Sequence, residues 1–431
     1  MPITDVLDTP AWFEHEIWPR TMYFQALSTC KKTRRLAEAS IRCPGNRWEL
    51  SVRLRPAVAG DASRWMRGMG VMSDAGSFSM TIDPSQVGED EGFREALLRV
   101  CRYLEQPCVR GPTELVVRRS MGDPELWPMP LTGYWRLRRL DLEAMTAWDA
   151  CVLNGILFES RWCLEGLRLV NVPDTGKSRV ESMDVFLFEG LTRLRSLSFR
   201  SLELSQSTRG KLLYGLLRLT SLTELHITNN LSVPERKDDL RAVVQRNTGL
   251  TDLDLSKNCL QSLFWLRDVK SLRHLNVSKN PLYNLNRQVG TTCRSVFKDL
   301  VTLRMVKCLL STRTLYKLVD LMACVNGDTV EVMDFAHNGA LEQNDTTYWL
   351  SLMLGRSLTG FTRLGELGLD HVDMHFAVRV QSCVLSILEG FSMREQPGRV
   401  TVSFQGNGFD SDPRYIKDFF NAFPKNVMIC I

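Results

Sequence analysis

The chain of 431 residues contains no long hydrophobic run. None approaches the roughly 20 consecutive apolar residues that a membrane-spanning helix requires. The segment up to Glu16 holds the acidic residues Asp5, Asp8 and Glu14, and it lacks the apolar stretch of a signal peptide. We therefore expect no membrane association and an intracellular location, in the cytoplasm or alternatively the nucleus.

Paired cysteines are also absent. The 12 cysteines occur singly, without a CxxC pair, and the 6 histidines do not complete a zinc-binding pattern. This usage is typical of free thiols in a reducing compartment. We expect no metal and no cofactor.

Neither positive nor negative residues are in large excess. The 54 lysines and arginines nearly balance the 49 acidic residues, which leaves a net charge of +5. This balance does not demand a nucleic-acid or membrane partner. The hydrophobic content of 44% and the charged content of 24% are ordinary for a globular protein.

What the chain does contain is one short phrase repeated from Leu137 to Leu369. The phrase is leucine, two residues, leucine, one residue, leucine, with some aliphatic or aromatic replacements. An apolar phrase recurring at this period predicts a solenoid, which offers an extended binding surface. The copies are LRRLDL (137–142), LEGLRL (164–169), LRSLSF (194–199), LTELHI (222–227), LTDLDL (250–255), LRHLNV (272–277), LVTLRM (300–305), VEVMDF (330–335) and LGELGL (364–369).

The spacing of the copies predicts the elements between them. Most steps are close to the 28 residues from Leu222 to Leu250, which leaves room for a strand, a turn and a helix. The step from Leu250 to Leu272 is only 22 residues and predicts a 3₁₀ or short helical return. Helices are expected at 207–219, after Asp238, after a cap at Ser311 or Thr312, and at about 374–391.

Five turns that follow the strands carry asparagine or cysteine at the same place. A buried side chain at this point can satisfy the backbone groups of adjacent turns. These residues are Asn230, Asn258, Asn280, Cys308 and Asn338.

The segments LTELHITNNL (222–231), LTDLDLSKNCL (250–260) and LRHLNVSKNPL (272–282) resemble the leucine-rich repeat superfamily, in its ribonuclease-inhibitor-like branch of long repeats. The resemblance covers about residues 135–375. It implies an α/β fold, namely a leucine-rich repeat solenoid with a curved parallel sheet inside and helices outside. It also implies a non-catalytic scaffold or recognition subunit whose partner is another protein.

Weaker patterns extend on both sides of the repeats. Alternating apolar residues at Leu50–Leu54, Phe78–Ile82 and Leu115–Val117 predict strands of degenerate repeats, and a helix is expected at 91–104. VTVSFQGN (400–407) predicts one more strand, followed by a helix at 414–423. We divide the chain into a helical N-terminal segment (1–45), degenerate repeats (46–130, ending in the Pro- and Gly-rich loop 120–130), the solenoid (131–395) and a C-terminal capping repeat (396–431).

The N-terminal segment leaves two interpretations open. It could be a helical cap on the first strand. Alternatively, LSTCKKTRRLAEAS (27–40) resembles the second half of an F-box, although the leucine-proline opening is absent. That resemblance implies a substrate receptor of a ubiquitin ligase, in which Trp12–Leu36 would contact a cullin adaptor. The basic run Lys31–Arg35 permits a third hypothesis, a ribonucleoprotein-associated subunit.

Two motifs are candidates for a phosphate-binding or metal-binding site. Thr175–Ser178 (TGKS) matches the end of a phosphate-binding loop, but Asn171 stands where that loop needs glycine, so a surface turn is favoured. His371 and His375 have the spacing of zinc ligands on a helix, but no adjacent glutamate or third ligand accompanies them. No nucleophile signature is present. We expect no enzyme.

The strand pattern predicts where a partner would bind. In each phrase the leucines point into the core, so the residue between them points to the opposite, concave face. Two flanking rows should share this face, one of them running Glu143, Val170, Arg200, Thr228, Ser256, Ser278, Val306, Ala336 and Asp370. The candidate partner-binding residues are the polar ones at the centre: Glu224, His226, Asp252, Asp254, His274, Asn276 and Arg304.

Three carboxylates beside two imidazoles favour a basic protein partner and a pH-sensitive contact. The alternative is that an exposed sheet face is polar in any case. The partner would then bind the convex helices or an edge.

Overall fold

The computed structural model describes residues 50–54, 78–82, 113–118, 137–143, 156–170, 188, 190–201, 213–229, 237–287, 289, 296–338, 354–372, 390, 399–406 and 427–430. The chain divides into two compact units, one of 1–197 with 201–218 and the other of 198–200 with 219–431. The predictions for the N-terminal segment and for helices at 91–104, 374–391 and 414–423 lie outside the described residues.

In the first unit, five strands pair in sequence order and every pairing is parallel. The three weak alternations upstream of the repeats are therefore confirmed as strands of one sheet. Its third strand pairs directly with the fourth, so strands on both sides of the predicted break at 120–130 belong to one sheet, while 120–130 itself lies outside the described residues. The strands are β1 (Leu50–Leu54), β2 (Phe78–Ile82), β3 (Glu114–Arg118), β4 (Arg139–Glu143) and β5 (Gly166–Val170).

Among the described residues of the second unit, eight strands are also parallel and paired in sequence order. They are β7 (Glu224–Thr228), β8 (Asp252–Asp254), β9 (His274–Asn276), β10 (Thr302–Arg304), β11 (Val332–Asp334), β12 (Glu366–Gly368), β13 (Val400–Ser403) and β14 (Val427–Cys430). Strand β6 (Ser196–Arg200) lies at the division between the units. The predicted strand in VTVSFQGN is confirmed as β13, whereas β14 was not predicted.

The leucine phrase forms these strands because its apolar side chains alternate onto one face. Leu225, Leu253 and Leu303 are each 0% exposed, and Leu275 is 1% exposed. The next apolar position is equally buried, as at Leu255, Val277 and Met305. Stacking identical positions from successive strands builds one continuous core, which no single repeat could form alone.

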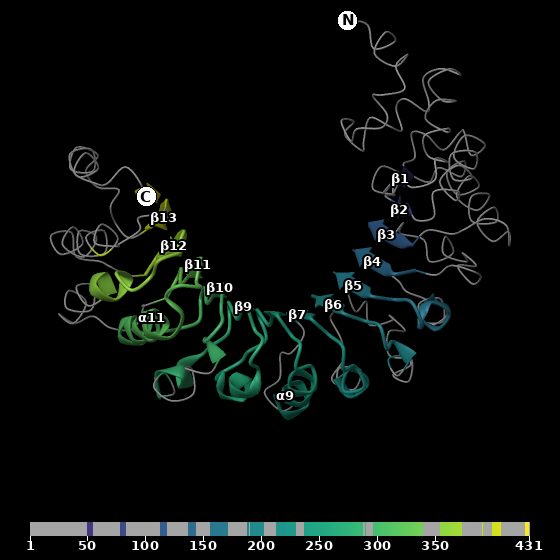
Figure 1. Ribbon diagram of the computed structural model, residues 1–431, viewed down its shortest axis with the longest axis horizontal. Coiled ribbons are helices and arrows are strands. Elements are labelled where there is room, and N and C mark those ends of the chain that lie inside the picture. Colours follow the sequence, from purple (N-terminus) through teal and green to yellow (C-terminus); the bar gives the residue numbers. More distant parts are fainter. Residues whose placement is uncertain are drawn as a thin grey trace, which may run out of the picture. The chain divides into compact units, whose positions relative to one another are not determined.

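The returns between the strands follow the spacing of the phrases. Helix α9 (Lys237–Arg246) buries Leu240, Val243 and Val244, and α11 (Thr312–Asn326) begins at Ser311, whose hydroxyl accepts the amide N–H of Thr314 at 3.3 Å. The predicted cap at Ser311 is confirmed. Within the second unit, α9 and α11 lie on the outer side of the row of strands (Figure 1).

The 22-residue step holds the 3₁₀ helix η6 (Phe264–Asp268), as predicted, and η7 (Tyr283–Arg287) follows β9. Residues 156–160, 213–216 and 354–358 are also helical. The fold is thus an open parallel sheet made of strand-and-return units, which is compatible with the predicted α/β solenoid.

Buried side chains connect the turns that follow the strands. Asn280 is 0% exposed, and its side-chain amide donates to the carbonyls of Leu255 (2.9 Å) and Val277 (2.8 Å). Its Oδ1 accepts the N–H groups of Asn258 (2.8 Å) and Leu260 (2.9 Å). Asn258 and Asn338 make the same kind of bonds, and the Cys308 thiol donates to the Val277 carbonyl at 3.2 Å. The prediction for these four residues is confirmed, while Asn230 lies outside the described residues.

Among the described residues, no helix is long and apolar enough to cross a membrane.

Candidate partner-binding surface

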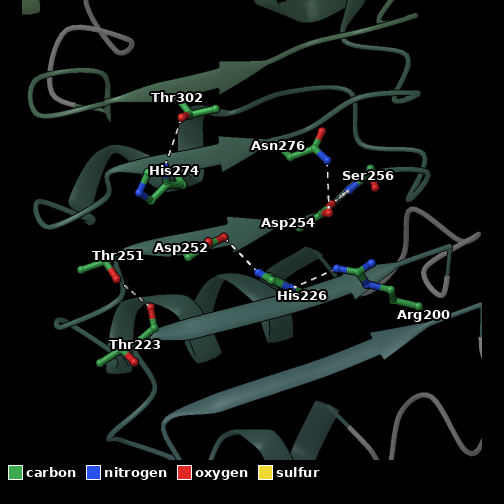
Figure 2. Close-up of polar contacts among 10 residues, drawn as sticks. All are labelled: Arg200, Thr223, His226, Thr251, Asp252, Asp254, Ser256, His274, Asn276 and Thr302. Atoms are coloured by element: carbon green, nitrogen blue, oxygen red, sulfur yellow. Dashed lines mark hydrogen bonds and ion pairs between the residues drawn. The ribbon is translucent and has the colours of Figure 1, made fainter. Parts of the chain in front are cut away.

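The seven candidate residues come together on four neighbouring strands. One row of paired positions runs Glu224, Asp252, His274 and Thr302 across β7 to β10. The adjacent row runs His226, Asp254, Asn276 and Arg304. Figure 2 shows the side chains of these rows on one face of the sheet, except those of Glu224 and Arg304. Since neighbouring strands are about 4.8 Å apart, side chains of adjacent rungs are within hydrogen-bonding reach.

His226 is held between two charged neighbours. Its Nε2 lies 2.9 Å from Asp252 Oδ1, and Arg200 Nη2 lies 3.4 Å from its Nδ1 (Figure 2). Arginine only donates and a carboxylate only accepts, so the neutral ring that fits both contacts carries its proton on Nε2. These two contacts fix the orientation of the imidazole. A catalytic histidine accepts a proton from a nucleophile through its unprotonated nitrogen, but here that nitrogen, Nδ1, faces Arg200.

Asp254 and Asn276 serve the fold as well as the surface. Asp254 Oδ1 accepts the N–H of Ser256 at 2.9 Å, and Asn276 Oδ1 accepts the N–H of Ser278 at 3.1 Å. Each side chain thereby closes the turn after its own strand, as aspartate and asparagine commonly do. Asn276 Nδ2 also donates to Asp254 Oδ2 at 3.1 Å (Figure 2).

Arg304 occupies the same row but cannot accept a hydrogen bond. The Ser278 hydroxyl replaces the missing acceptor by binding the N–H of Val306 at 3.1 Å. The Arg304 side chain is exposed, because the turn after β10 does not require it.

Glu224 and His274 are the exposed members of the other row. His274 Nδ1 lies 3.2 Å from the Thr302 hydroxyl (Figure 2). Each of them is the first residue of its strand. These two side chains, with the half-exposed Asp252, offer the carboxylate and imidazole groups most accessible to a partner.

In one flanking row predicted to be on this face, four of the nine residues are buried and the other five are partly exposed. Ser256 and Ser278 are 8% exposed, and Val170 and Ala336 are 7% exposed. The reason lies in strand length, since β8, β9 and β11 end one or more residues before this row. The chain then turns through a residue of positive φ, such as Lys257 at 59°, so the strict alternation of an extended strand no longer applies. The expected exposure of this row therefore holds only in part, and its member Arg200 contacts His226 on the predicted face (Figure 2).

The polar face continues onto β11 and β12 with a more buried carboxylate. Asp334 Oδ1 accepts the N–H of Ala336 at 3.1 Å. Burial raises the pKa of Asp334, and nearby Asp370 and Glu366 act in the same direction, whereas the Ala336 N–H and Arg304 oppose them. Gly368 lies beside this carboxylate, which occupies the space that a larger side chain at 368 would need.

A histidine pair joins two turns that the sequence did not connect. The rings of His337 and His371 are stacked, with centroids 4.3 Å apart and planes 10° from parallel. The sequence suggested His375 as the neighbour of His371, and His375 lies outside the described residues. His337 follows β11 at the position that His371 takes after β12, and this matching of repeat positions was the signal that could have revealed the pair.

The structure gives no contacts or distances for the remaining candidate motifs. Thr175–Ser178 lies outside the described residues, as does Trp12–Leu36, so the nucleotide-binding, F-box and ribonucleoprotein hypotheses stay predictions. Within the described residues, no three histidine, cysteine or acidic side chains are grouped so as to hold a metal ion. Burial raises the pKa of the Cys308 thiol to about 12, against the opposing effect of nearby backbone hydrogen bonds, so this cysteine is a thiol at neutral pH.

No protein-family model matches the chain, and a search of curated proteins gave no match either.

Proposed function

We propose that this chain is a leucine-rich repeat protein of the long-repeat type, and that it binds a protein partner through the exposed polar face of β7 to β10. It would act as a non-catalytic scaffold or recognition subunit. The support for the repeat type is the combination of the sequence phrase, the parallel strand-and-return units and the buried asparagine positions.

One observation carries the choice of surface. Arg200, His226 and Asp252 are bonded to one another across three strands, next to the exposed Glu224 and His274. Side chains on rigid strands, already oriented by their neighbours, lose little conformational entropy when a partner binds. This favours the strand face over a face covered by long mobile side chains.

The charge of the face indicates the kind of partner. Glu224 and Asp252 are adjacent in one row, and the Asp254 carboxylate lies on the same strand as Asp252. Arg304 stands at the far end, away from these three carboxylates. A basic patch on the partner would complement this centre, because opposite potentials both steer association and select the partner.

The test compares partners recovered with the purified full-length protein and with Glu224→Lys/Asp252→Lys. Recovered proteins are quantified by mass spectrometry after affinity purification. A specific partner should fall at least about tenfold with the double variant, since two complementary charges become repulsive. Asp252→Lys also removes the contact to His226, so a thermal melt of each variant is measured alongside.

The matched control is Asp299→Lys/Asp328→Lys, which makes the same change in net charge. Both aspartates are exposed in the second unit and lie in turns before β10 and β11, outside the two rows. This control should keep the partner. A partner retained by both double variants would contradict binding at the strand face and would favour the convex helices.

A further inference from the structure

A ladder of residues with left-handed backbone follows the strands of the second unit. Lys257, Lys279 and Lys307 have φ values of 59°, 59° and 54°, and each stands three residues after the end of its strand. His337 and His371 continue the ladder after β11 and β12, and Gly406 completes it after β13 with φ of 69°. We call Lys257, Lys279 and Lys307 the lysine row.

The backbone holds this row in register. The N–H of Lys257 donates to the Ser278 carbonyl at 2.9 Å, that of Lys279 to the Val306 carbonyl at 2.6 Å, and that of Lys307 to the Ala336 carbonyl at 2.9 Å. Each turn is thus bonded to the next. The lysine backbones are therefore spaced like the strands they follow, at about 4.8 Å.

Lysine is an unfavourable choice for this backbone. The left-handed region is costly for residues with a Cβ, and glycine, asparagine, aspartate and histidine adopt it more readily. Gly406 occupies the equivalent turn without that strain. The left-handed conformation itself belongs to the turn, since Ser201 and Asn229 also adopt it after β6 and β7. The sequence nevertheless places lysine in three consecutive turns.

The three ammonium groups also lack neutralising partners within the described part of the chain. All three side chains are exposed, and no described carboxylate forms an ion pair with them. Like charges on adjacent rungs repel one another. An acidic ligand would relieve this repulsion.

An apolar side chain lies next to the row. Leu309, two residues after Lys307, is 51% exposed and has φ of 55°. Cys259 has the equivalent position after Lys257 and is also exposed. Neither position carries the aromatic side chain on which bases of a single-stranded nucleic acid stack. An exposed leucine beside cations instead suits a polypeptide that combines acidic and apolar residues.

We propose that the lysine row, together with Leu309, binds an acidic segment of a partner protein that carries apolar side chains. This surface is separate from the strand face and has the opposite charge. The inference therefore does not depend on the proposed function, and variants of Glu224 and Asp252 test the other surface independently.

The probe is a short fluorescent peptide of glutamate interspersed with leucine, titrated with the full-length protein and followed by anisotropy. Lys257→Glu/Lys279→Glu/Lys307→Glu should weaken binding about tenfold or more, because three attractive contacts become repulsive. The control Lys270→Glu/Lys298→Glu/Lys317→Glu changes the net charge equally at three exposed lysines outside the row. It should change the dissociation constant less than about threefold. Equal losses in both triple variants, or no binding by the wild type, would overturn the proposal.

A second triple variant separates loss of binding from loss of folding. Lys257→Gly/Lys279→Gly/Lys307→Gly removes the charges and relieves the left-handed strain. It should lose binding while its melting temperature stays equal to the wild-type value or rises. A glycine variant that binds the peptide as well as the wild type would contradict the role of the lysines.

Two further measurements define the ligand. Leu309→Asn removes the exposed apolar side chain but keeps a residue that tolerates positive φ, so peptide binding should weaken by about threefold. A labelled oligouridine of matching charge tests the class of partner. Oligouridine that binds as tightly as the peptide, with the same sensitivity to the lysine variants, would assign the row to nucleic acid and overturn the proposal.

Discussion

On the strand face of the second unit, polar side chains bond to one another and to the backbone, whereas the side chains of the lysine row beside it form no ion pairs with described residues. Asp254 closes a turn and Asp252 binds His226. Lys257, only three residues after Asp254, has an exposed ammonium group and contributes to its turn through its backbone N–H, which donates to the Ser278 carbonyl.

The difference separates side chains that the fold requires from those it does not. A polar residue on a solenoid strand can satisfy the N–H of the next turn, and this need alone explains Asp254 and Asn276. No such need explains the lysines, since the turn would form with less strain if it contained glycine. Polarity by itself is therefore a poor sign of a binding surface, because the fold alone accounts for polar residues such as Asp254 and Asn276.

The largest expected effect compares Asn280 with its neighbour Lys279. Asn280→Ala leaves the buried N–H groups of Asn258 and Leu260 and two buried carbonyls without their partner, and should lower the free energy of unfolding by about 3 kcal/mol. Lys279→Ala keeps a Cβ at the same positive φ and should change it by less than about 0.5 kcal/mol. Urea denaturation measures both, and similar losses would remove the distinction between the two positions.

An intermediate effect is expected at Asp254, where the chemical requirement is an acceptor and not a charge. Asp254→Ala loses the bond to the Ser256 N–H and should cost about 1 kcal/mol of unfolding free energy. Asp254→Asn keeps the acceptor, as Asn276 does naturally one strand further on, and should cost less than about 0.5 kcal/mol. If the two variants were equally stable in urea denaturation, the turn would not depend on this side chain.

The strands and the buried asparagines were predictable because they repeat. Leu253 and Asn280 each have equivalents at fixed spacing, and only one arrangement stacks both sets at once. The short step between Leu250 and Leu272 similarly allowed only a short return, which is η6. Strand β14 was missed because its segment VMIC lacks the leucine phrase and is recognised only through its pairing with β13.

The geometry after the strands was not predictable from alternation. The burial of Ser256 and Ser278 depends on where the chain leaves the extended conformation, and no apolar pattern marks that point. Positive φ at a lysine has no local sequence signal either. The recurring lysine at Lys257, Lys279 and Lys307 was nevertheless readable in the repeats, and aligning them would have shown the row before the structure did.

Within the candidate surface, the sequence indicated which residues share a face but not how they are bonded. The pairing of Glu224 with Asp252 follows from the strand register. The contact between His226 and Arg200 depends on a long side chain reaching from a neighbouring strand, and several directions were open to it. Side-chain partners therefore required coordinates, even though strand positions did not.

The smallest expected effect lies at the end of the ladder, where the lysine row gives way to the stacked histidines. Burial lowers the pKa of His337 from its ordinary value of 6.5, and positive charge on His371 and Lys307 lowers it further, while Asp370 and Asp334 act in the opposite direction. The unfolded chain therefore binds this proton more readily than the folded one. The contribution of His337 to stability is complete above pH 6.5 and is lost as the pH falls below that value through the folded pKa.

NMR titration of the imidazole resonances, assigned with a His337→Asn variant, measures this pKa directly. Lys307→Gln removes one of the charges that disfavour protonation, so the pKa of His337 should rise toward 6.5. Lys257→Gln, three rungs from His337, should leave this pKa nearly unchanged. The effect on stability is small because solvent screens an exposed side chain. Two outcomes would contradict this prediction: a His337 pKa above 6.5 in the wild type, or equal shifts of that pKa in the two glutamine variants. Either would mean that Lys307 does not lower the pKa of His337, and that the lysine row and the histidine pair are separate surfaces.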